Sequence, residues 1–182
     1  RLTRLRDKYT QLAKLGVERL LVVNFNAKFA AMTPYDFVHR LLAEQLGVKF
    51  LVVGDDFRFG AERQGDFCYL QDEARSVGFE VVSTQSFTVS TQRVSSTAIR
   101  NELADGNQLA TEDMLGRPYS ISGRVSHGKK LGRTIGFPTA NVPLKRRVTP
   151  VSGVYVVKVG GIETNQWLGG VANVGTRPTV NG

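Results

Sequence analysis

Apolar and polar residues along the first part of the chain follow a pattern that predicts helices alternating with strands. Apolar side chains recur every three or four residues from Leu2 to Leu15, which is typical of an amphipathic helix, and Gly16 is expected to end it. Residues 18–25 (ERLLVVNF) are mostly apolar and predict a buried strand. The chain therefore begins with a predicted helix followed by a strand.

The same order recurs twice. A second helix is predicted to begin at Thr33, with Pro34 at its first position, and to end at Gly47. A third helix is predicted over about residues 66–77, ending at Gly78. A predicted strand follows each of these glycines, VKFLVVG after Gly47 and FEVVST after Gly78. The apolar face expected for the second helix consists of Phe37, Leu41, Leu42 and Leu46.

Regular spacing of the helix ends indicates the fold class. The helix-to-strand glycines Gly16, Gly47 and Gly78 recur every 31 residues, which suits parallel strands joined by right-handed helical crossovers. We therefore expect an α/β fold with a Rossmann-like parallel sheet. Because the chain opens on a helix, we expect the first strand of that sheet to be missing.

The second part of the chain has a different pattern. Short strands are predicted over residues 119–126, 153–159 and 166–174, with Gly160 and Gly161 as a hairpin signal between the last two. No helix is predicted after about residue 116. This pattern predicts a small antiparallel β-barrel with too few strands to close, so we expect it to be incomplete.

The charge and the cysteine content indicate which partners and which cellular location to expect for this protein. The net charge is +8, and residues 104–182 hold 10 Lys and Arg against 4 Asp and Glu, which favours a phosphate-bearing partner. The single cysteine, Cys68, forms no internal disulfide, so a cytoplasmic location is expected. No apolar run approaches the ~20 residues that a membrane span needs, and a homo-oligomer is compatible with the sequence.

Two loops follow predicted strands or begin helices, where ligands bind in open parallel sheets. In the stretch GDDFRFG (residues 54–60), Asp55 and Asp56 offer carboxylates, and Phe57 offers flat apolar surface to a planar ring. An ordinary turn with a hydrophobic plug explains this stretch equally well. In RVSSTAIR (residues 93–100), hydroxyls at a helix start either cap the helix or also bind phosphate.

A third candidate is the stretch HGKKLGRTIGFPTAN (residues 127–141), where regularly spaced glycines let the backbone approach a ligand. It lacks the Walker A pattern. Its positive side chains suit phosphates, and Thr139 and Asn141 offer neutral oxygens that suit Mg²⁺ when phosphates also bind the ion. The glycines are Gly128, Gly132 and Gly136, and the cations are Lys129, Lys130 and Arg133.

These stretches resemble the bacterial bifunctional riboflavin kinase/FAD synthetase family. VVNFNAKFAAMTPYDFV, LVVGDDFRFG and RVSSTAIR are similar to its nucleotidylyltransferase domain. LGRPYSISGRVSHGKKLGRTIGFPTAN, GVYVV and GVANVGTRPTVNG are similar to its β-barrel kinase domain. The resemblance implies an FMN adenylyltransferase domain over residues 1–103, a linker or short helix over 104–117 and a riboflavin kinase domain over 118–182.

The resemblance also implies roles for individual residues. The substrates are riboflavin, FMN and ATP, with Mg²⁺ as the metal and flavins as substrate and product. Arg100 and Arg133 are the expected catalytic residues, and Thr139 and Asn141 the expected metal ligands. The flavin is expected to contact Gly54, Asp55, Asp56 and Phe57, and the ATP phosphates to contact Ser95, Ser96, Thr97, Arg100, Gly128, Lys130, Gly132 and Arg133.

Two features of the family do not align with this chain. The His-x-Gly-His loop of the transferase has no counterpart, because neither His39 nor His127 lies in such a loop. The proposed kinase carboxylate lies after the Arg-Pro-Thr region, and the chain stops at Gly182. We therefore expect the 182-residue chain alone to be inactive in both reactions.

Two other functions remain open at this point. A basic nucleic-acid-binding module fits the excess positive charge, but the aromatic residues do not alternate with the basic ones as a stacking surface requires. A fragment that binds flavin nucleotides without turnover fits the sequence equally well.

Overall fold

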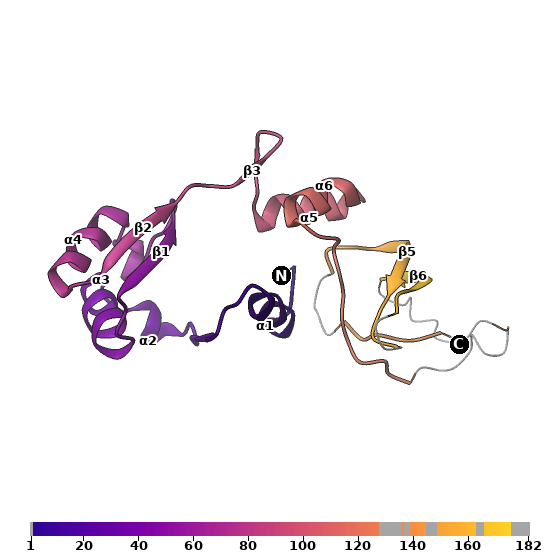
Figure 1. Ribbon diagram of the computed structural model, residues 1–182, viewed down its shortest axis with the longest axis horizontal. Helices are drawn as coiled ribbons and strands as arrows, with labels where there is room; N and C mark the ends of the chain where they lie inside the picture. The colour runs from indigo at the N-terminus through magenta and orange to yellow at the C-terminus, as the bar shows by residue number, and fades with distance from the viewer. Residues whose placement is uncertain (1, 128–135, 137–138, 145–148, 163–165, 176–182) are drawn as a thin grey trace. The chain divides into compact units, whose positions relative to one another are not determined.

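The computed structural model describes residues 2–127, 136, 139–144, 149–162 and 166–175 (Figure 1). The chain forms two compact units, of which one is Arg19–Arg93 and the other joins Arg1–Glu18 to Val94–Gly182. The first unit is an α/β structure with a parallel strand pair, and the second combines helices with an antiparallel strand pair.

A two-stranded parallel sheet organises the unit Arg19–Arg93. Strand β1 (Phe50–Gly54) pairs with β2 (Glu80–Thr84) in register from Phe50 opposite Glu80 to Gly54 opposite Thr84. The crossover between them contains a helix at Phe67–Val77, which confirms the helix predicted over about residues 66–77, and a short 3₁₀ helix at Ala61–Arg63, which the sequence did not predict. The other elements are α2 (Ala27–Ala30), α3 (Pro34–Asp36), the π-helix η1 (Phe37–Gln45), η2 (Ala61–Arg63), α4 (Phe67–Val77), β3 (Thr88–Val89) and β4 (Gln92–Arg93).

Local capping signals set the helix boundaries where the sequence predicted them. The Thr33 hydroxyl accepts from the Asp36 amide at 3.0 Å, and Pro34 occupies the first helical position. The Asp66 carboxylate accepts from the Tyr69 amide at 2.9 Å and begins α4. Gly78 ends α4 in the left-handed conformation, with φ of 81°. These predictions are confirmed.

One face of the β1–β2 pair carries the core of this unit. Val53 and Val81 point into it, and α4 and η1 pack over the same cluster (Figure 1). On the opposite face Phe50, Val52 and Val82 are exposed. The buried cluster consists of Val38, Leu42, Val53, Phe59, Leu70, Ala74, Phe79 and Val81.

The predicted strand over residues 18–25 is wrong. This segment is described in full, has no strand assignment and is exposed throughout. An apolar run favours a strand only when a neighbouring backbone pairs with it, and among the described residues β1 and β2 pair only with each other. The pattern therefore identified an apolar segment but not its conformation.

The apolar face predicted for the second helix is also partly wrong. The Leu46 amide donates to the Leu41 carbonyl, five residues back, at 3.0 Å, because this helix is a π-helix. Val38 and Leu42 are buried, whereas Leu46 is 46% exposed. The predicted face therefore missed Val38 and included Leu46, which is exposed.

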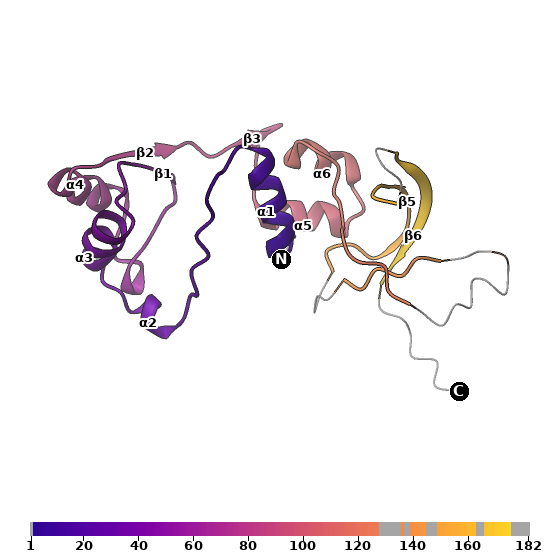
Figure 2. The ribbon, with the colours of Figure 1, turned by 60° about the horizontal axis from the view of Figure 1, so that its bottom comes forward.

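Within its described residues, the second unit contains three helices and the antiparallel strands β5 and β6. Helices α5 and α6 lie side by side (Figure 2), and α6 falls within residues 104–117, for which the sequence suggested a linker or a short helix. The buried core of the second unit consists of Ile99, Leu103, Met114 and Val151. The elements are α1 (Leu5–Lys14), α5 (Ser96–Ala104), α6 (Gln108–Leu115), β5 (Gly153–Val159) and β6 (Leu168–Val174).

Strands β5 and β6 confirm two of the three strands predicted in this part. They pair antiparallel, from Gly153 opposite Val174 to Val159 opposite Leu168. The strand predicted over residues 119–126 is wrong, because these residues have no strand assignment and, among the described residues, form a single bridge, between Ser126 and Asn141. The segment has alternating apolar and polar residues. In the described part of the chain, however, no strand pairs with it beyond this single bridge.

Side-chain hydrogen bonds attach the first helix to the segment that follows α6. The Tyr119 hydroxyl donates to the Leu2 carbonyl at 3.0 Å, and the Ser122 hydroxyl donates to the Asp7 carboxylate at 2.7 Å. The Arg4 guanidinium also donates to the Ser122 carbonyl. Residues from the start of the chain thus belong to the same compact unit as α5 and α6.

Leu103 and Leu109 provide a matched test of this packing, since both lie on helices of the same unit. Leu103 is 1% exposed in α5, whereas Leu109 is 78% exposed in α6. We expect Leu103→Ala to lower the free energy of unfolding by about 2–5 kcal/mol. Leu109→Ala should change it by less than about 0.5 kcal/mol.

Chemical denaturation of both variants measures this difference. Equal destabilisation by the two substitutions would contradict the packing of α5.

Candidate functional site

The carboxyl ends of β1 and β2 lie at the same edge of the sheet, because the strands are parallel and Gly54 is opposite Thr84. The loop after β1 begins as a turn in which the Phe57 amide donates to the Gly54 carbonyl at 3.1 Å. Asp55 and Asp56 occupy the centre of this turn and are exposed. The residues predicted to contact the flavin therefore form one continuous turn at the carboxyl edge of the parallel strand pair, which is where ligands generally bind in open parallel sheets.

Ser86, in the loop after β2, and Arg93, at the end of β4, contact the two carboxylates. The Ser86 hydroxyl and amide donate to Asp55 Oδ2 at 2.7 and 3.1 Å. The Arg93 guanidinium lies 2.8 Å from Asp56 Oδ2 and 3.5 Å from Asp55 Oδ1. The two loops are thus joined by one hydroxyl, one amide and one guanidinium.

These contacts change the ionisation of Asp55. The hydrogen bond from the Ser86 hydroxyl holds the pKa of Asp55 below its ordinary value, with the Ser86 amide and Arg93 acting in the same direction against desolvation. The lowered pKa means that the Asp55–Ser86 contact favours folding at neutral pH. That contribution is lost as the pH falls from 3.8 through the lower pKa of the folded state.

Aromatic residues pack between the same turn and the core. Phe59 is 6% exposed and belongs to the core, so it is the hydrophobic plug of this loop. Phe57 stacks on Phe59 with ring centroids 5.4 Å apart and an interplanar angle of 18°. Gly65 permits this arrangement, because a Cβ there would lie 2.7 Å from the Phe59 ring. Phe57 is only partly buried and is the aromatic residue of the pair that a ligand can reach.

The start of α5 is the second candidate site. The Ser95 hydroxyl accepts from the Ala98 amide at 3.1 Å and caps the helix. Ser96, Thr97 and Arg100 are exposed, whereas Ile99 faces the core. The helix start therefore presents two hydroxyls and one guanidinium to solvent, together with the positive end of the helix dipole.

The third candidate is the loop after residue 126. Thr139 is exposed and Asn141 is partly buried. The Ser126 amide donates to the Asn141 carbonyl at 2.8 Å, so the two ends of this loop are held together. The remaining predicted residues of this loop lie outside the described residues: Gly128, Lys129, Lys130, Gly132 and Arg133.

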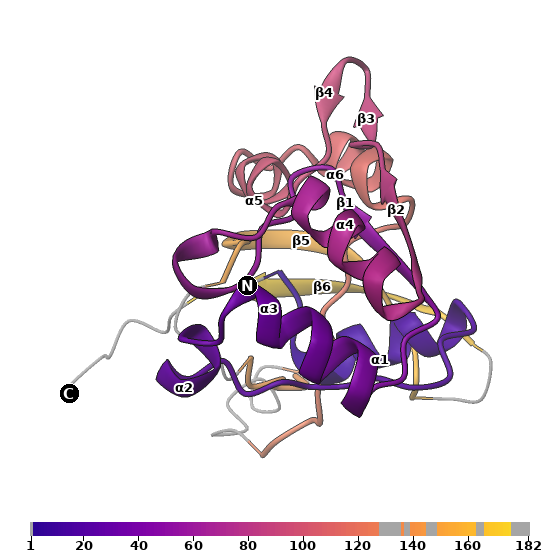
Figure 3. The same cartoon turned by 90° about the vertical axis from the view of Figure 1, so that its left-hand side faces the viewer.

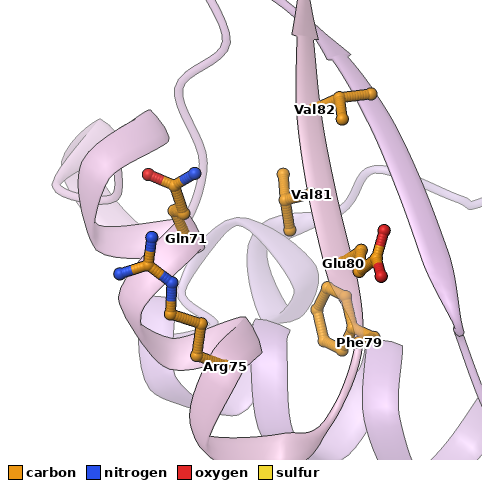
Figure 4. Close-up of a pocket in the computed structure, with 6 residues that line it drawn as sticks. All are labelled: Gln71, Arg75, Phe79, Glu80, Val81 and Val82. Carbon is orange, nitrogen blue, oxygen red and sulfur yellow. The ribbon is translucent and has the colours of Figure 1, made fainter.

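A shallow pocket of about 190 Å³ lies between α4 and β2 (Figure 4). Phe79 and Val81 form its base, and the polar groups of Gln71 and Arg75 lie at its rim. None of the predicted site residues lines it. In the part of the chain that the structure describes, no group of three His, Cys, Asp or Glu side chains could hold a metal ion.

Ser86 and Arg93 were not among the site residues predicted from the sequence. Neither residue type signals a site by itself, and their role depends on contacts with residues 31 to 38 positions away. The parallel crossover could have indicated them, because it brings the segments after both strands to one edge.

Two family models match the chain. Residues 1–98 match the model for FAD synthetase, and residues 115–182 match the model for riboflavin kinase. The first match covers more than half of the chain. Every helix within the described residues is too short or too polar to traverse a lipid bilayer.

Similar proteins extend over the whole chain. The bifunctional riboflavin kinase/FMN adenylyltransferase of Escherichia coli (strain K12) is 57% identical over 182 residues, covering 100% of this chain and 58% of that protein. The protein of the same description from Haemophilus influenzae is 50% identical over 182 residues and is covered to 59%. The chain thus spans less than two thirds of the length of these relatives.

A solved structure has a similar fold. The crystal structure described as a macrolide-efflux protein from Streptococcus pneumoniae has a TM-score of 0.77 and 31% sequence identity. The similarity covers 100% of this chain and 58% of the other.

Ser86→Ala tests the link between the two loops. Removal of the hydroxyl donor should raise the pKa of Asp55 toward 3.8, because the charged form loses its shortest hydrogen bond. Ser83→Ala, at an exposed position of β2, is the control and should leave the pKa of Asp55 unchanged. Carboxyl ¹³C chemical shifts followed through a pH titration measure the difference. An unchanged pKa in Ser86→Ala would refute the contact.

Proposed function

Because the chain belongs to the FAD synthetase family, we propose that its protein adenylylates FMN to FAD and, through the C-terminal part, phosphorylates riboflavin to FMN. The observation that carries this proposal is that the FAD synthetase and riboflavin kinase models match residues 1–98 and 115–182 of one chain, in that order. Relatives at 57% and 50% identity carry both names.

In the adenylyl transfer, a phosphate oxygen of FMN attacks the α-phosphorus of ATP. The bond between the α-phosphorus and its bridging oxygen breaks, and pyrophosphate leaves with the bonding electrons. The start of α5 supports a role in holding this leaving group, since Ser96, Thr97 and Arg100 are exposed at a helix N-terminus, where backbone N–H groups favour anions. Ser95 holds the helix start in place through its cap.

The turn at residues 54–57 is the proposed flavin site of the transferase. Phe57 offers a partly exposed ring, and aromatic residues pair well with planar ring systems. Asp55 and Asp56 offer acceptors for flavin N–H and ribityl O–H groups. Gly54 lets the backbone lie close to the Asp56 side chain, because a Cβ at residue 54 would lie 3.3 Å from the Asp56 carboxylate.

In the kinase reaction, the terminal ribityl hydroxyl attacks the γ-phosphorus of ATP and ADP leaves. Ser126 and Asn141 hold the two ends of one loop together. We assign this loop to the binding of the ATP phosphates, through Gly128, Lys130, Gly132 and Arg133. The Thr139 hydroxyl and Asn141 amide are oxygen donors of the kind that Mg²⁺ accepts. When bound, Mg²⁺ would neutralise charge on the transferring phosphoryl group.

The remaining assignments follow from the same proposal. We assign residues 1–103 to a nucleotidylyltransferase domain with a Rossmann-like sheet, 104–117 to a linker helix and 118–182 to a kinase domain built on a β-barrel. The antiparallel hairpin β5–β6 supports the barrel, and the exposed, unpaired Cys68 is compatible with a reducing cytoplasm.

Arg100→Ala tests the adenylyltransferase assignment in the full-length protein. Loss of one charged donor to the leaving group should lower kcat/KM for FAD formation by about 10²-fold. Riboflavin phosphorylation should remain unchanged, and Arg100→Lys should recover part of the rate. Arg40→Ala, which removes a charge that is also exposed from η1, is the control.

Chromatography that resolves FMN from FAD measures both rates in one sample. Normal FAD formation by Arg100→Ala would restrict the Ser95–Arg100 segment to a structural role.

Thr139→Ala tests the kinase assignment. The variant should lose riboflavin phosphorylation by at least about 10²-fold, because the metal would lose an oxygen ligand, and should keep FMN adenylylation. Asn141→Ala should behave in the same way, whereas Thr139→Ser keeps the hydroxyl and should keep most of the activity. Equal loss of both activities in a folded variant would argue against two separate sites.

A further inference from the structure

Helix α1 lies in one family match, but side chains at its start contact the other. The helix (Leu5–Lys14) lies within residues 1–98, which match FAD synthetase, whereas the segment 119–126 lies within residues 115–182, which match riboflavin kinase. Both are part of the compact unit that joins Arg1–Glu18 to Val94–Gly182. Contacts inside a single compact unit therefore cross the boundary between the two matches.

The Ser122 hydroxyl lies at the centre of these contacts. It donates to Asp7 Oδ1 at 2.7 Å and accepts from a terminal nitrogen of Arg4 at 3.1 Å. The same Arg4 nitrogen also donates to the Ser122 carbonyl. A serine hydroxyl can donate one hydrogen bond while it accepts another, and an alanine side chain can do neither.

Asp7 is more sheltered than an ordinary surface carboxylate. Its side chain is 16% exposed, and that of its ion-pair partner Arg4 is 28% exposed. Burial alone would raise the pKa of Asp7, but hydrogen bonds from the Ser122 hydroxyl and from Arg4 outweigh burial and lower the pKa below its ordinary value. Hydrogen bonds to a charged group are stronger than those between neutral groups, so the Asp7 carboxylate holds Ser122 firmly.

Apolar packing accompanies these hydrogen bonds. Leu2, Tyr119 and Ile121 pack against the buried core of this unit. Strands β5 and β6 lie side by side (Figure 3) and contribute Tyr155 and Val174 to the same packing. The start of the chain and the segment 119–126 therefore share one core.

A second set of contacts joins the segment 119–126 to the stretch that carries Asn141. A Cβ at Gly123 would lie 2.5 Å from the Val142 side chain, so the backbone at Gly123 and the Val142 side chain pack against each other. The Ser126 amide donates to the Asn141 carbonyl at 2.8 Å. Among the described residues this single bridge is the only sheet-type pairing of the segment, so its course depends on side-chain contacts.

These contacts form a short path from α1 to the assigned Mg²⁺ ligand Asn141. Ser122 is adjacent to Gly123, and Ser126 lies four residues beyond Ser122, which is at most about 14 Å along an extended chain. Catalysis is sensitive to small displacements, because a shift of about 1 Å caused by a distant substitution can cost about 10²-fold in rate. A contact that fixes Ser122 therefore affects where Asn141 lies.

We propose that Ser122, held by Arg4 and Asp7 at the start of α1, is a positioning residue of the kinase site, because it fixes the segment against which the Asn141 stretch packs. This inference rests on the proposed riboflavin kinase function. It assigns the start of α1, which lies in the FAD synthetase match, to the phosphorylation reaction. Adenylylation of FMN does not depend on this contact.

Ser122→Ala in the full-length protein provides the test, because it removes the hydroxyl and leaves the Arg4 amide bonded to Asp7 Oδ2. The kcat/KM for ATP in riboflavin phosphorylation should fall about tenfold, less than for a lost metal ligand. KM for riboflavin and the rate of FMN adenylylation should change by less than about twofold. Ser122→Thr keeps a hydroxyl and should recover most of the rate.

Two further variants control for the site of substitution. Ser120→Ala removes a hydroxyl from an exposed position two residues earlier, where it accepts from Arg117 at 3.5 Å, and should leave both activities unchanged. Arg4→Gln removes the guanidinium from the other side of the contact and should impair phosphorylation selectively. Because both groups act on one contact, Arg4→Gln combined with Ser122→Ala should lose clearly less than the product of the two single losses.

Two measurements report the contact without turnover. In Ser122→Ala the pKa of Asp7 should rise, because the charged carboxylate loses the donor at 2.7 Å, and carboxyl ¹³C shifts through a pH titration measure this change. The backbone amide signals of Asn141 and Val142 should also shift in Ser122→Ala and stay in place in Ser120→Ala.

Three results would overturn the inference alone: an unchanged pKa of Asp7 in Ser122→Ala, a parallel fall of phosphorylation and adenylylation, or a Ser122→Thr variant as impaired as Ser122→Ala. A full-length wild-type protein that phosphorylates no riboflavin would overturn the proposed kinase function together with this inference.

Discussion

Parallel pairing of β1 with β2 is the constraint on which the candidate flavin site depends. Because both strands run in the same direction, their carboxyl ends lie together, and the turn after Gly54 lies beside the segment after Thr84. An antiparallel pair would place these ends at opposite edges. The crossover through α4 makes the parallel pairing possible, and the core beneath it fixes Phe59 under Phe57. The contacts of Ser86 and Arg93 with the carboxylates follow from that arrangement.

Structure set by local signals could be predicted from the sequence. Thr33, Ser95 and Gly78 have caps or end conformations that depend on neighbouring residues only, so the helix boundaries were correct. Structure set by distant partners could not. Residues 18–25 and 119–126 have strand-like patterns, but a pattern does not specify which backbone will pair with it. The π-helical turn of η1, which changes the buried face, also has no sequence signal at this level.

The candidate site shows the same division. The turn Gly54–Phe57 could be found because it follows a predicted strand, and the helix start at Ser95 because hydroxyls precede an apolar repeat. The sequence could not distinguish the buried Phe59 from the accessible Phe57, since both lie in the same short loop. Nor could it identify Ser86 and Arg93, whose contacts with Asp55 span 31 and 38 positions. Resemblance to a known family suggested the chemistry, and the structure identified the residues that contact the two carboxylates.

The most direct test of the proposed flavin site is amide chemical-shift mapping of the isotopically labelled full-length protein during titration with FMN. We predict the largest shifts at Asp55, Asp56 and Phe57, with smaller shifts at Ser86 and Arg93. Thr139 and Asn141 should respond in addition when riboflavin or ATP occupies the kinase site. Shifts confined to residues 139–144, with no response at residues 54–57 at saturating FMN, would contradict a flavin site at the edge of the parallel sheet.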